Sequence, residues 1–207
     1  MVRNNRNSKL VVLAAGISAL ALTLTACGSS SDSADATATT SDAPAEVEVV
    51  DGVPATLVGM HIEGAEGGAW AAAPFGALRM WDNGTAWSQI ELAKGEFKWG
   101  NIDGLIENAT SKGMTDIMMV LGTTPEWAAK EINDSDYPQP GAASAPANMA
   151  DWDDWVTAVV DRYSDSFTSY QIWNEANLKD FFNGTPAEMA DMTKRAYDII
   201  KAKNPEA

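Results

Sequence analysis

The sequence from about residue 55 onward predicts an α/β fold built around a parallel β-sheet. Short apolar runs, which suit buried strands, alternate there with longer segments whose apolar residues recur at helical spacing. The later runs are apolar without strict alternation, as expected for strands that are covered on both faces. Together these patterns predict a series of βα units over 55–207.

Four strands and three helices are expected in this segment. The strands are predicted at 56–62, 77–81, 116–121 and 169–173, and the helices at 101–111, 149–163 and 186–203. A long segment rich in Asp, Ser, Pro, Gly and Ala separates the third strand from the second helix. Loops of this length in compact domains are usually functional or disordered.

Local signals support the bounds of these elements. Asp82-Asn83-Gly84 is a turn signal that closes the second strand, and Gly113 follows the first helix. Pro186 suits the first turn of the last helix. On the helix over 149–163, Trp152 and Trp155 lie on the apolar face, and we assign both to the core.

The first 26 residues have the character of a secretory signal peptide. A short basic head precedes an apolar run over 10–24 that is too short and too rich in alanine and threonine for a membrane span. The run ends in Leu24-Thr25-Ala26-Cys27, which resembles the lipobox of bacterial lipoproteins. The resemblance implies that Cys27 is acylated and becomes the first residue of the mature chain. The alternative is an ordinary signal peptide that contains a cysteine, but Cys27 is the only cysteine and has no disulfide partner.

Residues 27–54 are predicted to form an acylated cysteine followed by a disordered acidic tether, because small and acidic residues dominate this stretch. Signal cleavage removes three of the 14 basic residues and none of the 29 acidic ones, which leaves a net charge of −18. This charge argues against a nucleic-acid partner. The protein is expected to associate with the membrane through the lipid anchor on Cys27. The predicted location is the outer face of the bacterial cytoplasmic membrane.

Polar and aromatic side chains gather at the predicted carboxyl ends of the four strands, where parallel α/β proteins place their active sites. In chain order they are His61, Glu63, Arg79, Trp81, Asp82, Thr123, Thr124, Trp127, Trp173, Asn174, Glu175 and Asn177. Indole rings stack on the apolar faces of sugars, and the polar groups can bind sugar hydroxyls, so a carbohydrate substrate is expected. One histidine among scattered carboxylates gives no metal-site spacing, and we expect neither a metal nor a cofactor.

Several motifs at these strand ends resemble those of retaining clan-A glycoside hydrolases. Trp173-Asn174-Glu175-Ala176-Asn177 resembles the Asn-Glu signature of the clan. Further segments are similar to the β-xylosidase and α-L-iduronidase group; they are Leu78-Arg79-Met80-Trp81-Asp82, Trp87-Ser88-Gln89-Ile90-Glu91, Gly95-Glu96-Phe97-Lys98-Trp99, Asn101-Ile102-Asp103 and Gly122-Thr123-Thr124-Pro125-Glu126-Trp127. The resemblance covers residues 56–207.

This resemblance implies a (β/α)₈ barrel that hydrolyses O-glycosidic bonds by a retaining double displacement. It implies that Glu175 is the acid/base, that Asn174 binds the sugar 2-hydroxyl, and that Arg79 lies under the nucleophile and keeps it ionised. The other expected substrate-binding residues are His61, Trp81, Trp127, Trp173 and Asn177. For three of the expected site residues a structural role is the alternative. Arg79 could be an ion-pair partner, His61 a satisfied polar group, and Trp173 part of the barrel core.

The nucleophile of this family is a glutamate near the end of the seventh strand, and no residue of this chain can be matched to it. A (β/α)₈ barrel takes about 250 residues, so 55–207 is expected to be its N-terminal half, with about four βα units, and the chain to be a fragment. Two other functions stay open: a non-catalytic carbohydrate-binding lipoprotein of the cell surface and, with less support, the solute-binding lipoprotein of an importer.

Overall fold

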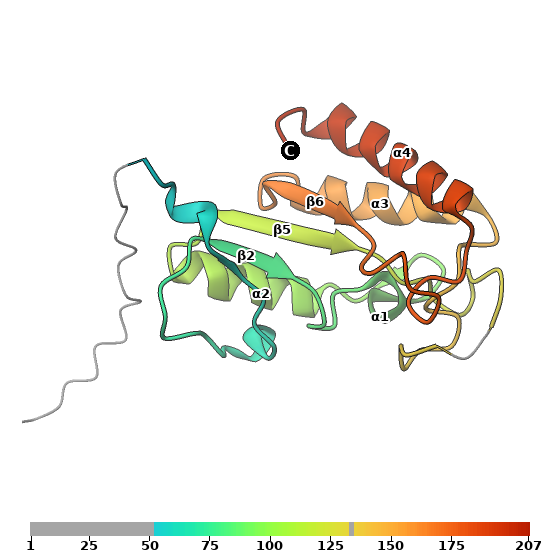
Figure 1. Ribbon diagram of the computed structural model, residues 1–207, viewed down its shortest axis with the longest axis horizontal. Coiled ribbons are helices and arrows are strands. Elements are labelled where there is room, and N and C mark those ends of the chain that lie inside the picture. Colours follow the sequence, from blue (N-terminus) through green and yellow to red (C-terminus); the bar gives the residue numbers. More distant parts are fainter. Residues whose placement is uncertain (1–51, 133–134) are drawn as a thin grey trace, which may run out of the picture. The chain divides into compact units, whose positions relative to one another are not determined.

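The computed structural model of the protein describes residues 52–207 except 133 and 134. The predicted signal peptide, Cys27 and nearly all of the predicted tether lie outside the described residues. The described residues contain a four-stranded parallel sheet with the order β1-β2-β5-β6 (Figure 1). Its strands are β1 (Gly59–Met60), β2 (Ala77–Met80), β5 (Asp116–Leu121) and β6 (Ser169–Ile172).

Three long helices alternate with these strands and share one hydrophobic core with them. They are α2 (Gly100–Ser111), α3 (Met149–Tyr163) and α4 (Pro186–Lys203). Helix α2 leads from β2 to β5 and α3 leads from β5 to β6, so the predicted βα rhythm is confirmed. The bounds of β5, α3 and α4 agree with those predicted from the sequence.

The first strand is much shorter than the sequence predicts. A 3₁₀ helix, η1 (Ala55–Leu57), takes up its expected beginning, and only Gly59 and Met60 pair with β2. The backbone before β2 approaches η1 so closely that a Cβ on Gly76 would lie 2.1 Å from the carbonyl oxygen of Ala55. This close approach requires glycine, because any side chain at position 76 would collide with the η1 backbone.

The segment between β2 and α2 contains elements that the sequence did not predict. They are the short helix α1 (Trp87–Ile90) and an antiparallel hairpin of β3 (Glu91–Ala93) and β4 (Glu96–Phe97); a second 3₁₀ helix, η2 (Ala65–Gly67), follows β1. The buried Glu91 carboxylate accepts hydrogen bonds from Trp87 Nε1 at 2.6 Å and from the backbone N–H of Gly95 at 2.7 Å. These bonds join the hairpin to α1.

For the described residues, the expectation that the later strands are covered on both faces holds only at the end of β5, where Met119, Val120 and Leu121 are all buried. On β2, Leu78 and Met80 are buried in the core shared with the helices, whereas Ala77 and Arg79 are partly exposed. Ala77 and Arg79 line a hollow that runs across β1, β2, β5 and β6. Sequence alone did not reveal this difference because apolar residues such as Met118 also occur on the open face.

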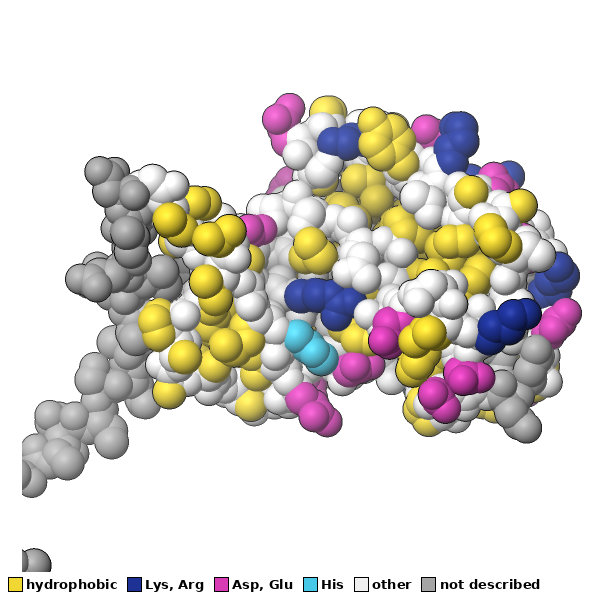
Figure 2. Space-filling view, viewed as in Figure 1, with side chains coloured by type: hydrophobic (Ala, Val, Ile, Leu, Met, Phe, Trp, Pro, Cys, Tyr) yellow, Lys and Arg dark blue, Asp and Glu magenta, His cyan; other side chains and the backbone are white. Residues whose placement is uncertain are grey.

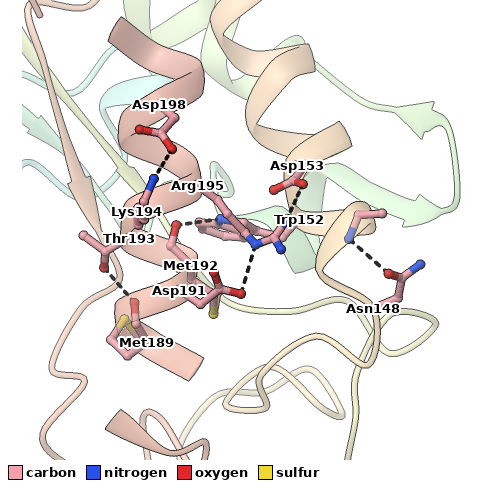
Figure 3. A network of polar contacts seen from close by, with 11 residues as sticks. Asn148, Trp152, Asp153, Met189, Asp191, Met192, Thr193, Lys194, Arg195 and Asp198 are labelled. Carbon is pink, nitrogen blue, oxygen red and sulfur yellow. Dashed lines mark hydrogen bonds and ion pairs between the residues drawn. The ribbon is translucent and has the colours of Figure 1, made fainter. Parts of the chain in front are cut away.

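Helices α3 and α4 pack together through one buried indole and a surface ion-pair network (Figure 3). Trp152 is fully buried, and its Nε1 donates a hydrogen bond of 3.0 Å to the carbonyl oxygen of Met192. Arg195 contacts Asp153 of α3 at 2.7 Å and Asp191 of its own helix at 2.9 Å. These contacts hold α4, which follows the loop after β6, against α3.

The helix ends follow from local chemistry. Thr185 and Glu188 form a capping box at the start of α4, with Pro186 in the first turn as predicted. The Asn148 side chain caps α3 by accepting a hydrogen bond from the Ala150 N–H. Among residues 52–207 without 133 and 134, no helix is long and apolar enough to cross a membrane.

Candidate active site

Strained backbone marks the edge of the sheet where the strands end. Among the described residues other than glycine, four have positive φ angles: Asp82 (55°), Thr123 (58°), Trp173 (64°) and Glu175 (51°). All four lie within three residues of the end of β2, β5 or β6. Left-handed backbone is costly for such side chains, above all for the β-branched Thr123, and it persists where the surroundings impose it. Concentrated strain of this kind is typical of functional sites.

A row of hydrogen-bonded side chains crosses this edge from β2 to the turn after β6. Arg79 Nε donates to Gln171 Oε1 at 3.0 Å, and Arg79 Nη2 donates to Asn174 Oδ1 at 2.8 Å. The Asn174 amide nitrogen donates in turn to Glu175 Oε2 at 3.0 Å. Because Arg79 and Gln171 lie two strands apart on the open face, their bond spans the intervening β5. The row thus aligns a guanidinium, a carboxamide and an exposed carboxylate.

The register of the sheet explains why these residues meet. Arg79 pairs with Met118 and Gln171 pairs with Val120, two positions that face the same side of β5 because they are two residues apart. Gln171 also donates through Nε2 to the Trp173 carbonyl oxygen at 2.7 Å, which fixes the turn that carries Asn174 and Glu175. Gln171 was not identified from the sequence. Its polar side chain within a predicted strand, two residues before Trp173, was the available signal.

The charges around Arg79 favour a stable cation. Burial lowers the pKa of the Arg79 guanidinium from its usual value, while the nearby carboxylates of Asp82 and Glu175 raise it. A guanidinium stays protonated in proteins, so the site keeps one fixed positive charge. Glu175 is exposed and can therefore be reached by a ligand.

His61 and Asn177 lie at the margins of the site. His61 is exposed and lines the same hollow as Arg79. Figure 2 shows this single histidine, in cyan, beside a basic side chain on the open face of the sheet. Asn177 is exposed in the turn that follows Glu175, a turn closed by the hydrogen bond from Leu178 N–H to the Glu175 carbonyl oxygen at 2.9 Å.

The tryptophans expected to bind substrate are separated by the structure. Trp81 is buried at the end of β2 in a small apolar cluster with Val120 on the open face of the sheet. Trp173 is buried in the main core, where its Nε1 donates to the Phe181 carbonyl oxygen at 2.8 Å. Its geometry matches the alternative of barrel core.

Trp127 belongs to a different aromatic group. Its ring meets Trp87 edge to face at 6.0 Å, and its Nε1 donates to the Glu91 carbonyl oxygen at 2.8 Å. Its contacts thus tie the loop after β5 to α1 and the β3–β4 hairpin. The structure does not bring Trp127 together with Asn174 and Glu175. Its position after the strand end could not show this, because its partners Trp87 and Glu91 are distant in sequence.

Two buried threonines anchor the loops around the site. Thr123 Oγ1 and Ser88 Oγ are 2.8 Å apart, and this pair ties α1 to the end of β5. Thr124 Oγ1 donates to the Ser144 carbonyl oxygen at 2.6 Å and so holds the returning part of the β5–α3 loop. In the part of the chain that the structure describes, no group of three or more His, Cys, Asp or Glu side chains is placed to hold a metal ion.

Tyr137, which the sequence analysis did not single out, lies beside the row of polar side chains. Its ring contacts Trp81 and Phe181 edge to face, at 6.2 Å and 5.3 Å between ring centroids. Burial raises the pKa of the Tyr137 phenol to about 12, so the group stays protonated at neutral pH. The length of the 131–147 loop was the only signal that pointed to this region.

Comparison with known proteins identifies the fold. No model of a protein family matches the sequence, and no curated protein matches it. Among solved structures, a monomeric β-xylosidase from Caulobacter crescentus CB15 is similar, with a TM-score of 0.56 and 20% identity over 72% of this chain and 34% of that chain. A family 39 glycoside hydrolase from Bacteroides cellulosilyticus WH2 follows with a TM-score of 0.47 and 19% identity over 64% of this chain and 25% of that one.

The first of these similarities establishes the fold alone. The four parallel strands and the three long helices form part of a (β/α)₈ barrel of the kind found in glycoside hydrolases. The chain spans about a third of the length of the Caulobacter β-xylosidase.

Proposed function

We propose that this chain is the N-terminal part of a retaining glycoside hydrolase that acts on oligosaccharides or polysaccharides. The observation that carries the proposal is the row Arg79–Asn174–Glu175, which lies at the strand ends of a glycosidase-like barrel and ends in an exposed carboxylate. Glu175 is the acid/base in this proposal. It protonates the departing glycosidic oxygen and then removes a proton from the attacking water.

Asn174 and Arg79 prepare the site for this chemistry. The Asn174 amide bonded to Glu175 presents polar atoms next to the acid, where the 2-hydroxyl of a bound sugar would lie. Arg79 carries the fixed positive charge that would keep a second carboxylate ionised. In a retaining enzyme that second carboxylate is the nucleophile and lies about 5 Å from the acid. We assign no residue of this chain to it.

The role of Glu175 can be tested in a protein that contains the complete barrel. Glu175→Ala should keep the first step on a substrate with an acidic phenol leaving group, since departure then needs no proton, while the second step slows. Glycosyl-enzyme should accumulate, which gives a burst and a lower KM. Azide should restore turnover with retained configuration. Unactivated substrates should lose roughly 10²–10⁴-fold in rate. An inverted azide product would make Glu175 the nucleophile and contradict the assignment.

Residues 28–207 by themselves should bind sugars without hydrolysing them. Residues 28–207 contain the proposed acid/base but no assigned nucleophile, so aryl glycosides should not be turned over above background. Release of the phenol chromophore measures this directly, with Glu175→Gln as the matched variant. Turnover that disappears in Glu175→Gln would contradict the expectation, because the chain would then supply its own nucleophile.

For the N-terminus we propose a lipid-anchored, extracytoplasmic protein. The support is the lipobox-like Leu24-Thr25-Ala26-Cys27 and the acidic stretch that follows it. The lipid would hold the folded part at the outer face of the cytoplasmic membrane, where polymeric carbohydrate is accessible.

A further inference from the structure

The long loop between β5 and α3 brings Tyr137 to the ends of two other strands. The Tyr137 ring is held between Trp81, which directly follows β2, and Phe181, in the segment after β6. The interplanar angles are 74° and 76°, so both contacts are edge to face, a favourable geometry for aromatic pairs. A hydrogen bond from Asp136 N–H to the Asp180 carbonyl oxygen, at 3.3 Å, joins the same two loops.

The hydroxyl of Tyr137 needs an explanation that packing alone does not supply. Its oxygen is buried and has no hydrogen-bond partner within the described part of the chain. Burying a hydroxyl without a partner is unfavourable, and phenylalanine would make the same ring contacts without that cost. Burial raises the pKa of this phenol and the nearby Asn174 side chain lowers it, while the charges of Asp82, Glu175 and Arg79 also act on it.

Asn174 has one donor left for this hydroxyl. Its carboxamide oxygen accepts from Arg79 at 2.8 Å, and one of its two N–H groups donates to Glu175 at 3.0 Å. The second N–H is the group that can donate to the phenol oxygen. This hydrogen bond would add to those with Arg79 and Glu175 and would fix the plane of the Asn174 carboxamide.

We propose that Tyr137 is a positioning residue for Asn174, so that the β5–α3 loop sets the orientation of the carboxamide beside Glu175. The inference rests on the proposed function for its significance, since Asn174 is the expected partner of the sugar 2-hydroxyl. The hydroxyl of Tyr137 does not contact the sugar. It holds the amide in the orientation in which Asn174 can bond to Arg79, Glu175 and a sugar hydroxyl at the same time.

Nuclear magnetic resonance of residues 28–207 tests the geometry without any need for sugar binding. The side-chain NH₂ signals of Asn174, identified by their loss in Asn174→Asp, should show nuclear Overhauser contacts to the Tyr137 ring in the unmodified chain. In Tyr137→Phe the two NH₂ signals should shift and their hydrogen exchange should accelerate. Tyr197→Phe, at an exposed position of α4, is the matched control and should leave them unchanged. Missing Overhauser contacts, or Asn174 signals that are unaffected by Tyr137→Phe, would overturn the proposal.

Sugar binding separates this inference from the proposed function. With xylotriose and cellobiose as probes, Tyr137→Phe should weaken binding by roughly 3- to 10-fold, the effect of one neutral hydrogen bond, and Tyr197→Phe should not. If the unmodified chain binds neither probe while the Asn174 signals respond to Tyr137→Phe, the proposed function is contradicted and the positioning role stands. If sugars bind with equal affinity to both proteins and the Asn174 signals do not respond, the positioning role fails and the proposed function stands.

Discussion

At the scale of single residues, the strained backbone and the row of hydrogen-bonded side chains occur at the same place. Glu175 has a φ of 51° and accepts a hydrogen bond from Asn174, which in turn accepts one from Arg79. A glutamate in a left-handed conformation is held there by its neighbours at a cost in stability. This coincidence suggests that stability has been exchanged for the position of one carboxylate.

That cost is measurable by substitution at Glu175. Glycine adopts positive φ freely and alanine does not, so Glu175→Gly should be more stable than Glu175→Ala by roughly 1 kcal/mol in urea denaturation. The same pair at Glu126, which is exposed and has no positive φ, is the control. At Glu126 the alanine variant should be the more stable of the two, because glycine there increases the entropy of the unfolded chain without relieving strain. Equal stabilities at Glu175 would contradict the idea of local strain.

Glu188 predicts a pH dependence of stability. The hydrogen bond from Lys130, followed by those from the Thr185 backbone and hydroxyl, lowers the pKa of Glu188 to about 2. A lowered carboxyl pKa contributes stability above its unfolded value of about 4.3, and this contribution is lost as the pH falls through about 2. Glu188→Gln should therefore be less stable than the unmodified chain at pH 7, and the difference should shrink steadily below pH 4.

Urea denaturation at a series of pH values measures this difference. The expected value at pH 7 is roughly 0.5–1 kcal/mol, because the ion pair with Lys130 is partly exposed. Asp198→Asn removes the more exposed pair with Lys194 and should change stability by less than about 0.5 kcal/mol. A difference for Glu188→Gln that stays constant from pH 7 to 3 would exclude the linkage.

At the scale of elements, the packed helices hold the residues at the strand ends in position. Helix α4 begins shortly after the turn that carries Glu175, and the buried Trp152 of α3 bonds to the backbone of α4 at Met192. On the other side, Thr123 and Ser88 join β5 to α1. The polar row at the strand ends thus lies between elements that pack against one another.

The α3–α4 contact should dominate the stability of the C-terminal part. Trp152→Phe removes a hydrogen bond and leaves a cavity next to Met192, and we expect a loss of about 2–3 kcal/mol in the free energy of unfolding. Chemical denaturation followed by circular dichroism measures it. Tyr197→Phe on the exposed face of α4 is the control, expected to change stability by less than 0.5 kcal/mol. A loss below 1 kcal/mol for Trp152→Phe would show that the interface repacks.

At the scale of the whole molecule, the described residues form an open sheet. In the described part of the chain β1 and β6 each have a neighbour on one side only. Beside β6, the partly buried Tyr170 and Ile172 and the exposed Tyr197 line a shallow groove. Exposed strand edges and apolar grooves favour association, whereas the large negative charge of the chain opposes it.

The proposed lipid anchor predicts where the protein is found in the cell. If Cys27 is acylated, the protein should sediment with membranes, and Cys27→Ser should accumulate as an unprocessed precursor or be released. Immunoblotting of membrane and soluble fractions distinguishes the forms by location and size. Because the net charge of −18 on the mature chain opposes electrostatic binding to anionic lipid, a high-salt wash should not release the unmodified protein. Unchanged processing and membrane retention of Cys27→Ser would contradict the lipoprotein proposal.

The amino-acid sequence determined the order of the four parallel strands and the three long helices, and most of their limits. The bounds of β5, α3 and α4 could be predicted because apolar periodicity, caps and turn residues act within a few positions of the chain. The same local reasoning placed Arg79, Asn174 and Glu175 at one edge, since all carboxyl ends of parallel strands meet there. Their chemical roles stay predictions that rest on the proposed function.

Only the tertiary structure decided which side chains meet. Trp127 and Trp173 follow strands as Trp81 does, yet the first packs against Trp87 and the second is buried in the core. Tyr137 joins the site although it lies in a loop far from Asn174 in sequence. These outcomes depend on the register across β5 and on the path of a long loop. Both are set by contacts between distant residues, whose combined packing no local pattern in the sequence records.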